Sequence, residues 1–268
     1  MHPLHWTGRR LARWLSAPRG GAHADTSGAG RLARALRKGD VLLVEGTSRF
    51  ATVIRTVTQS NWSHSALYVG DAFAAGTGDP TPQFIEADIN DGVRAVPLET
   101  YVHLHTRICR PVGLSEDEID ALVGYAVARI GGQYDLRNVF DLARYLVHPQ
   151  LLPARYRRRM LAFGSGDPTR AICSSLIAAA FASIGYPVLP DVELVRAEGE
   201  AGREHAREIL HIRDSSLYAP RDFDMSPYFR IVKPTLENGF DREALVWAPR
   251  QPPAPEAHGQ AANRGLRP

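Results

Sequence analysis

The sequence predicts an α+β protein in which a mostly antiparallel sheet packs against helices. Short apolar runs bounded by turn residues follow one another closely between residues 39 and 111, which is typical of neighbouring strands. After residue 115, apolar residues recur at helical spacing. The alanine-rich stretch 173–184 is an apolar helix that can return and pack on the sheet. Strands first and helices afterwards is an α+β arrangement.

The predicted strands begin after the turn Gly39-Asp40. They are short runs rich in good strand formers and cover residues 41–44, 64–69, 83–87, 92–96 and 104–110. A helix over 48–59 joins the first two strands, because its apolar residues lie on one face. These strands lie close together in the chain, so the sheet is expected to be mostly antiparallel.

The helical part begins at Ser115, which forms a capping box with Glu118 and starts a helix that ends at Gly131-Gly132. A second helix is predicted around 139–147. The charged stretch 192–210 is helix-compatible and is expected to be a surface excursion, and residues 221–232 are expected to return as a late strand.

His64, at the start of the second strand, and Cys173, at the start of the helix 173–184, form a candidate catalytic pair. Imidazole is the side chain best suited to move a proton near neutral pH. In the first turn of a helix, unpaired N–H groups and the helix dipole favour thiolate over thiol, and they can bind the oxyanion formed by attack on a carbonyl. Taken singly, each residue is better explained by packing in a core.

Glu86 interrupts the apolar run 83–87. A charged residue inside a buried strand costs free energy unless it is paired. Pairing with His64 would orient the imidazole and support its protonated form, as the third group of a triad does. The alternative is a glutamate that faces water on an edge strand, and the run itself does not decide between the two.

Five segments then occur in a set order: Gly39-Asp40-Val41-Leu42-Leu43-Val44, Trp62-Ser63-His64 through Gly70, Phe84-Ile85-Glu86-Ala87, Gly131-Gly132-Gln133-Tyr134-Asp135 and Cys173-Ser174-Ser175-Leu176. This order resembles the circularly permuted branch of the NlpC/P60 papain-like superfamily, specifically the YiiX/YaeF-like group. Ordinary papain-like enzymes place the cysteine before the histidine, whereas the permuted branch places the histidine and its acidic partner first. The resemblance extends from about Gly39 to about Lys233.

The resemblance implies a permuted papain-like fold with Cys173 as nucleophile, His64 as base and Glu86 as the orienting residue. Tyr134 matches a tyrosine that lies near the active site in related enzymes, and Ser174 is a second candidate for contact with the substrate or the oxyanion. A side chain near Gln59 or Asn61 is a further candidate for a donor to the oxyanion.

Composition excludes several classes of protein. Of the 268 residues, 44% are hydrophobic and 23% are charged, which is enough apolar material for a core. The net charge of +3 is modest and no nucleic-acid-binding motif is present, so no nucleic-acid partner is expected. The two cysteines do not form a disulfide framework, and Cys109 is interpreted as a packing residue. Although His103 and His105 lie two residues apart, no carboxylate or cysteine completes a site, so neither a metal nor a cofactor is expected.

Three regions are predicted along the chain: a basic extension and linker over 1–30, a permuted papain-like domain over 31–248, and a disordered tail over 249–268. In the extension, Leu11, Trp14 and Leu15 share one helical face beside arginines, which suits either an interfacial membrane helix or a frayed basic extension. It lacks the apolar core of a secretory signal peptide, and no run reaches the roughly 20 residues of a spanning helix. A cytoplasmic protein is expected, with peripheral membrane contact as a further hypothesis.

Residues 145–170 combine leucines with the arginines at 155 and 157–159. They lie between the Tyr134 motif and Cys173, so an insertion here would be a lid or a lipid-facing surface. The alternative is an ordinary surface helix with solvated arginines.

The chemistry expected of the three residues is acyl transfer or hydrolysis at an amide or ester, through a thioester on Cys173. A small-molecule or lipid acyl substrate is favoured, because arginines beside leucines suit an anionic interface. A cysteine peptidase or amidase acting on cell-wall peptides is the first alternative. A ligand-binding module that has kept the fold without the chemistry is the second.

Overall fold

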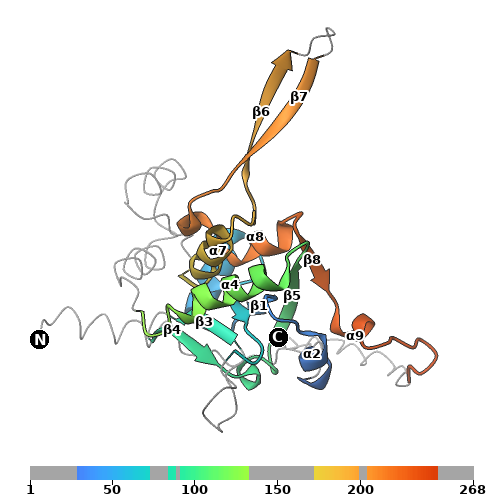
Figure 1. Ribbon diagram of the computed structural model, residues 1–268. Coiled ribbons are helices and arrows are strands. Elements are labelled where there is room, and N and C mark those ends of the chain that lie inside the picture. Colours follow the sequence, from blue (N-terminus) through green and yellow to red (C-terminus); the bar gives the residue numbers. More distant parts are fainter. Residues whose placement is uncertain (1–28, 73–83, 89–90, 133–171, 199–203, 247–268) are drawn as a thin grey trace, which may run out of the picture.

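The computed structural model describes residues 29–72, 84–88, 91–132, 172–198 and 204–246, and a six-stranded antiparallel sheet forms its centre (Figure 1). The predictions for the N-terminal extension, the helix at 139–147, Tyr134, the lid at 145–170 and the C-terminal tail therefore lie outside the described residues. The strands, in spatial order, are β4 (Gly92–Val96), β3 (Phe84–Asp88), β2 (His64–Tyr68), β1 (Val41–Glu45), β5 (His105–Pro111) and β8 (Phe229–Val232). All five neighbouring pairs are antiparallel, which confirms the predicted sheet.

The sheet is covered on both faces. Along β1, Val41 and Leu43 point into a large core with the helices α4 (Glu116–Val127) and α7 (Ile172–Ser183), while Leu42 and Val44 point into a second core with α2 (Ala29–Ala35). This alternation follows from the two-residue period of a strand. The helices are α2 (Ala29–Ala35), α3 (Arg49–Thr58), α4 (Glu116–Val127), α7 (Ile172–Ser183), α8 (Pro220–Met225) and α9 (Pro234–Glu237), with the short 3-10 turns η1 (Leu98–Thr100) and η2 (Ser215–Leu217). None of the helices in the described ranges has the length and apolarity needed to cross a membrane.

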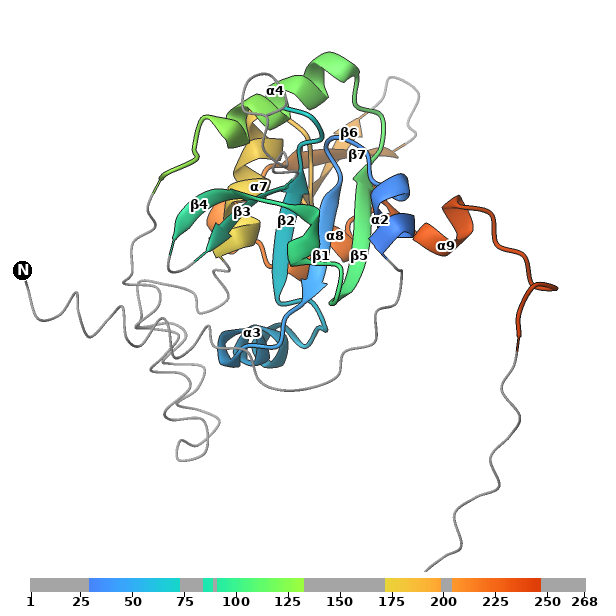
Figure 2. The ribbon, with the colours of Figure 1, turned by 90° about the horizontal axis from the view of Figure 1, so that it is seen from below.

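Local sequence signals explain where two of these helices begin and end. Ser48 caps α3 by accepting the N–H of Ala51 at 3.0 Å, and Gln59 ends it in the left-handed conformation. At α4, Ser115 and Glu118 form the predicted capping box. Figure 2 shows α3 at one end of the sheet, beside the end of β1 and the start of β2, where it borders the site described below.

The stretch predicted as a helix over 192–210 is instead a two-stranded hairpin, β6 (Asp191–Glu198) and β7 (Glu204–His211), so that prediction was wrong. Figure 1 shows this hairpin projecting away from the sheet. Two physical reasons favour the hairpin: Gly199 and Gly202 interrupt any continuous helix, and the β-branched Val192 and Val195 favour strands.

The late strand was also predicted too long. Residues 221–223 belong to the helix α8, and only Phe229–Val232 form the strand β8. Pro220 suits the first turn of a helix, and the Asp222 carboxylate accepts the N–H of Ala219 at 2.9 Å, which caps that turn.

Candidate active site

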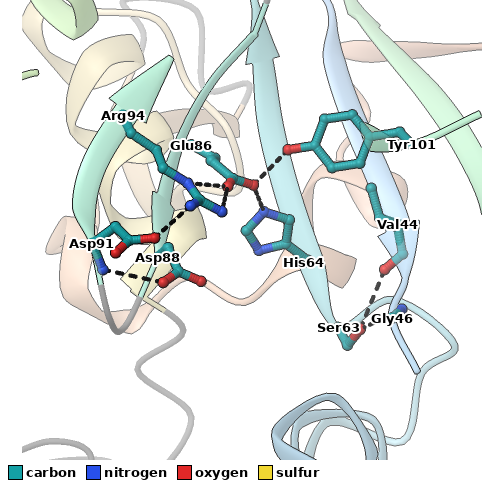
Figure 3. Close-up of polar contacts among 9 residues, drawn as sticks. All are labelled: Val44, Gly46, Ser63, His64, Glu86, Asp88, Asp91, Arg94 and Tyr101. Carbon is teal, nitrogen blue, oxygen red and sulfur yellow. Dashed lines mark hydrogen bonds and ion pairs between the residues drawn. The ribbon is translucent and has the colours of Figure 1, made fainter. Parts of the chain in front are cut away.

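The sheet and the helix packed on it bring the predicted residues His64, Glu86 and Cys173 together. His64 is the first residue of β2, Glu86 lies in the middle of the neighbouring strand β3, and Cys173 is the second residue of α7, which packs over both strands. The Nε2 atom of His64 lies 2.6 Å from Oε2 of Glu86 (Figure 3). Cys173 is hydrogen-bonded to the imidazole. Because Glu86 occupies Nε2, Nδ1 is the ring nitrogen left for the sulfur.

Electrostatics within this group favour a thiolate beside an imidazolium. Burial opposes ionisation of Cys173, yet the charge of His64 and hydrogen bonds from His64 and Ser65 keep the pKa of the thiol below its ordinary value. Burial alone would likewise lower the pKa of His64, but Cys173 and Glu86 raise it well above its ordinary value. The Ser65 hydroxyl is buried and has no hydrogen-bond partner among the described residues, so the contribution of Ser65 is assigned to its backbone N–H. The pair can therefore hold its proton on the ring and its negative charge on sulfur.

Glu86 is held by two residues that the sequence reasoning missed, Tyr101 and Arg94. The Tyr101 hydroxyl donates to Oε2 at 2.5 Å, and the Nε of Arg94 donates to Oε1 at 2.8 Å (Figure 3). Burial by itself would raise the pKa of Glu86, but His64, Tyr101 and Arg94 together hold it far below its ordinary value. The carboxylate is thus ionised although its side chain is only 5% exposed.

A cavity of about 300 Å³ opens beside this group. Cys173, His64, Glu86 and Arg94 contribute polar atoms to it. Its apolar wall comes from the end of β1, from α3 and from the segment after η1, and includes Val44, Phe50, Ala51, Tyr101 and Leu104.

The floor of the cavity near β1 depends on a close backbone approach. Gly46 donates its N–H to the Ser63 hydroxyl at 2.8 Å (Figure 3). A Cβ atom at position 46 would lie 3.0 Å from both the Ala51 Cβ and the Ser63 Oγ. A side chain here would push α3 or Ser63 away and change the shape of the cavity.

The remaining predicted contacts lie elsewhere. The Ser174 hydroxyl is buried and donates to the Tyr218 carbonyl at 2.6 Å, and Ser174 is not among the described residues that line the cavity. Gln59 and Asn61 line a separate polar hollow. Tyr134 lies outside the described residues. In the described ranges, no three His, Cys, Asp or Glu side chains are grouped so that they could hold a metal ion.

The sequence carried a signal for one of the two missed residues. Arg94 pairs with Glu86 in the register between β3 and β4, and it could have been found by pairing the strands predicted at 83–87 and 92–96 across their connection. Tyr101 follows η1 and gave no signal, because its contact with Glu86 depends on the tertiary fold.

Together, the fold and the site define a papain-like arrangement in which the histidine strand precedes the cysteine helix in the chain. Residues 35–145 match the model of a family described as permuted papain-like amidase enzymes, YaeF/YiiX, C92 family. This match supports the resemblance predicted from the motifs, and the chain has a permuted papain-like fold. The matched segment contains His64 and Glu86 and ends before Cys173.

Among solved structures, the chain is similar to one described as the metalloprotein yiiX from Escherichia coli O157:H7, with 15% sequence identity and a TM-score of 0.44. The alignment covers 74% of this chain and 97% of that one. No curated protein matches this sequence.

Proposed function

We propose that the protein is a cysteine-dependent amidase-type enzyme that forms an acyl thioester on Cys173 and releases the acyl group to water or to a second acceptor. One observation carries the proposal: a thiol in the first turn of a helix is hydrogen-bonded to a histidine whose other nitrogen lies 2.6 Å from a buried carboxylate, beside an open cavity. The description of the matched family as amidase enzymes supports the same reaction type.

The reaction has two halves. The Cys173 thiolate attacks the carbonyl carbon of an amide or ester, and a carbon–sulfur bond forms. The tetrahedral oxyanion can be bound by N–H groups in the first turn of α7. As this intermediate collapses, the carbon–nitrogen or carbon–oxygen bond breaks, and the leaving group takes the proton from the His64 imidazolium. The acyl group remains on sulfur.

In the second half, neutral His64 removes a proton from water as the water oxygen attacks the thioester. The carbon–sulfur bond breaks, the acid is released, and the thiolate and the imidazolium are restored. If an alcohol or amine attacks in place of water, the same steps transfer the acyl group. Glu86 orients the ring and supports its positive charge in both halves.

The walls of the cavity support an apolar acyl group as the part of the substrate bound next to the nucleophile. Phe50 and Ile54 pack against Cys173, and Val44 and Leu104 line the same space. Burying a chain of CH₂ groups there would contribute about 0.8 kcal/mol for each group. An acyl lipid or another acylated small molecule is therefore the substrate class that we propose, and peripheral membrane contact remains a prediction that follows from it.

Intact-protein mass spectrometry tests this proposal. The protein is incubated with phospholipids, N-acyl amino acids and muropeptides, and Cys173→Ala serves as the control. We expect an adduct whose mass corresponds to an acyl group and which is absent from the variant. An adduct formed from muropeptides alone would favour the cell-wall peptidase.

The non-catalytic module makes a different prediction. In that case Cys173 should react with iodoacetamide no faster at neutral pH than free cysteine does. A faster reaction, combined with no adduct from any donor, would place the missing substrate outside the panel.

A further inference from the structure

The two oxygens of the Glu86 carboxylate accept hydrogen bonds from different donors. Its Oε2 accepts from the ring of His64 at 2.6 Å and from the Tyr101 hydroxyl at 2.5 Å. Its Oε1 accepts from Arg94, with Nε and Nη2 both at 2.8 Å. One oxygen thus faces the proposed base, and the other faces a guanidinium (Figure 3).

The two added donors differ in charge and in burial. Tyr101 is 2% exposed, and burial, together with the nearby Glu86 charge, raises its pKa well above the ordinary value, so its hydroxyl stays protonated and neutral. Arg94 carries a full positive charge and its side chain is 40% exposed at the cavity. A neutral donor orients the carboxylate and leaves its charge in place, whereas a cation also offsets part of that charge.

We propose that Tyr101 and Arg94 are positioning residues for His64 that act through Glu86: Tyr101 fixes the oxygen that faces the imidazole, and Arg94 offsets part of the charge that the imidazole experiences. Neither residue needs to touch the substrate for this role. The juxtaposition follows from the register that sets Glu86 opposite Arg94 and from the fold that brings Tyr101 onto the same carboxylate.

The charge that Arg94 offsets matters because, in the proposed reaction, His64 must both hold a proton and release it. This inference therefore rests on the proposed function. A buried carboxylate with no opposing charge would stabilise the imidazolium so strongly that proton transfer to the leaving group would become unfavourable. Arg94 reduces that stabilisation. Its own charge is partly screened by solvent, so the effect is expected to be modest.

Other charged groups near Glu86 and His64 also influence the proton affinity of His64. His64 faces the Cys173 thiolate from α7 as well as Glu86 from β3. Arg94 faces Asp91, at 2.5 Å from Nη1, and also experiences the charge of Asp88. These two carboxylates offset part of the positive charge of Arg94, so they limit its effect on Glu86 and His64 without removing it.

The test is an NMR titration of the His64 ring, performed in full-length Cys173→Ala so that the thiolate does not contribute. Arg94→Gln should raise the proton affinity of His64 about three-fold, because a cation near the carboxylate is lost. Arg94→Lys should return the affinity to the parent value. Arg107→Gln is the matched control: Arg107 is 39% exposed and paired with Asp224, and it is not among the described residues that line the cavity.

Coupling through Glu86 is tested by a double-mutant cycle. In Glu86→Gln, Tyr101→Phe should not change the proton affinity of His64 further, because the carboxylate that Tyr101 orients is gone, whereas a role in general folding would persist in that background. An unchanged or lowered proton affinity of His64 in Arg94→Gln would overturn the inference. The titration needs no substrate, so it can succeed even if no acyl donor is ever found, and the acyl-adduct experiment can succeed even if Arg94 has no influence.

Discussion

The two cysteines of this protein are both buried, yet their surroundings shift their thiol pKa values in opposite directions. Cys173 is 4% exposed and Cys109 is fully buried. The pKa of Cys173 lies below the ordinary value of a thiol. Burial raises the pKa of Cys109 far above it, and the charge of Asp224 adds to that effect.

The difference lies in what each sulfur faces. Cys109 is in the middle of β5, paired with Val41 on one side and Ile231 on the other, and it packs into the large core. Cys173 is at the start of a helix and is hydrogen-bonded to an imidazole. Burial alone therefore raises the pKa of a thiol, whereas a cation supplied from a neighbouring strand lowers it.

The largest effect is expected at Cys173, the proposed nucleophile. Cys173→Ser keeps the shape of the side chain but replaces a thiol that ionises with a hydroxyl that does not, so turnover should fall by about 10⁴-fold or more. The measurement is the rate of product formation with whichever acyl donor forms the Cys173 adduct. Retention of turnover within about ten-fold would mean that Cys173 is not the nucleophile.

The next largest effect is expected at His64. His64→Gln removes the cation while keeping a polar side chain of similar size, so burial should dominate and Cys173 should come to resemble Cys109. We expect its alkylation by iodoacetamide at neutral pH to slow by about 100-fold. Mass spectrometry of peptides reports the two cysteines separately in the same sample. An unchanged rate at Cys173 would show that helix α7, and not His64, activates the thiol.

A smaller effect is expected at Glu86. Because Glu86 raises the pKa of His64, Glu86→Gln should lower it and shift the shared proton from the ring towards sulfur, which slows alkylation of Cys173 about ten-fold at neutral pH. The measurement is the alkylation rate as a function of pH. An increase in rate would contradict the proposed role of Glu86.

Glu86→Gln should also change the pH dependence of the free energy of unfolding. The raised pKa of His64 in the folded state contributes stability that is fully present below the unfolded pKa of about 6.5 and is lost as pH rises through the folded pKa. In Glu86→Gln that loss should occur at lower pH. Urea unfolding at a series of pH values measures the shift, with Arg107→Gln as the control.

Sequence alone predicted the parts of this molecule that depend on local patterns. The strands from Val41 to Pro111, the capping box at Ser115 and the helix carrying Cys173 follow from the period of apolar residues and from helix caps. The hairpin at 191–211 was missed because its charged composition also suits a helix, and the choice depends on pairing between strands.

The site was predicted as far as its chemistry could be inferred from residue types and motif order. Cys173, His64 and Glu86 do meet, whereas the Ser174 hydroxyl is used to hold the Tyr218 carbonyl. Tyr101 could not be predicted, since a tyrosine after a 3-10 turn has no preferred partner until the tertiary fold brings Glu86 next to it. Contacts of this kind depend on three-dimensional packing and leave no periodic signal in the chain.

The smallest effect is expected at the inert cysteine, and it sharpens the comparison. Cys109→Ser places a hydroxyl in the apolar core with no ready partner, so the free energy of unfolding should fall by about 1–3 kcal/mol. Cys109→Ala removes only the sulfur and should cost about 1 kcal/mol. Urea unfolding measures both variants, and neither should change the alkylation rate of Cys173 in the folded protein.

By contrast, Cys173→Ser should be nearly neutral in stability, because its hydroxyl can still hydrogen-bond to His64. If instead Cys109→Ser were harmless and Cys173→Ser strongly destabilising, then Cys173 would be a packing residue and the proposed division between the two thiols would be reversed.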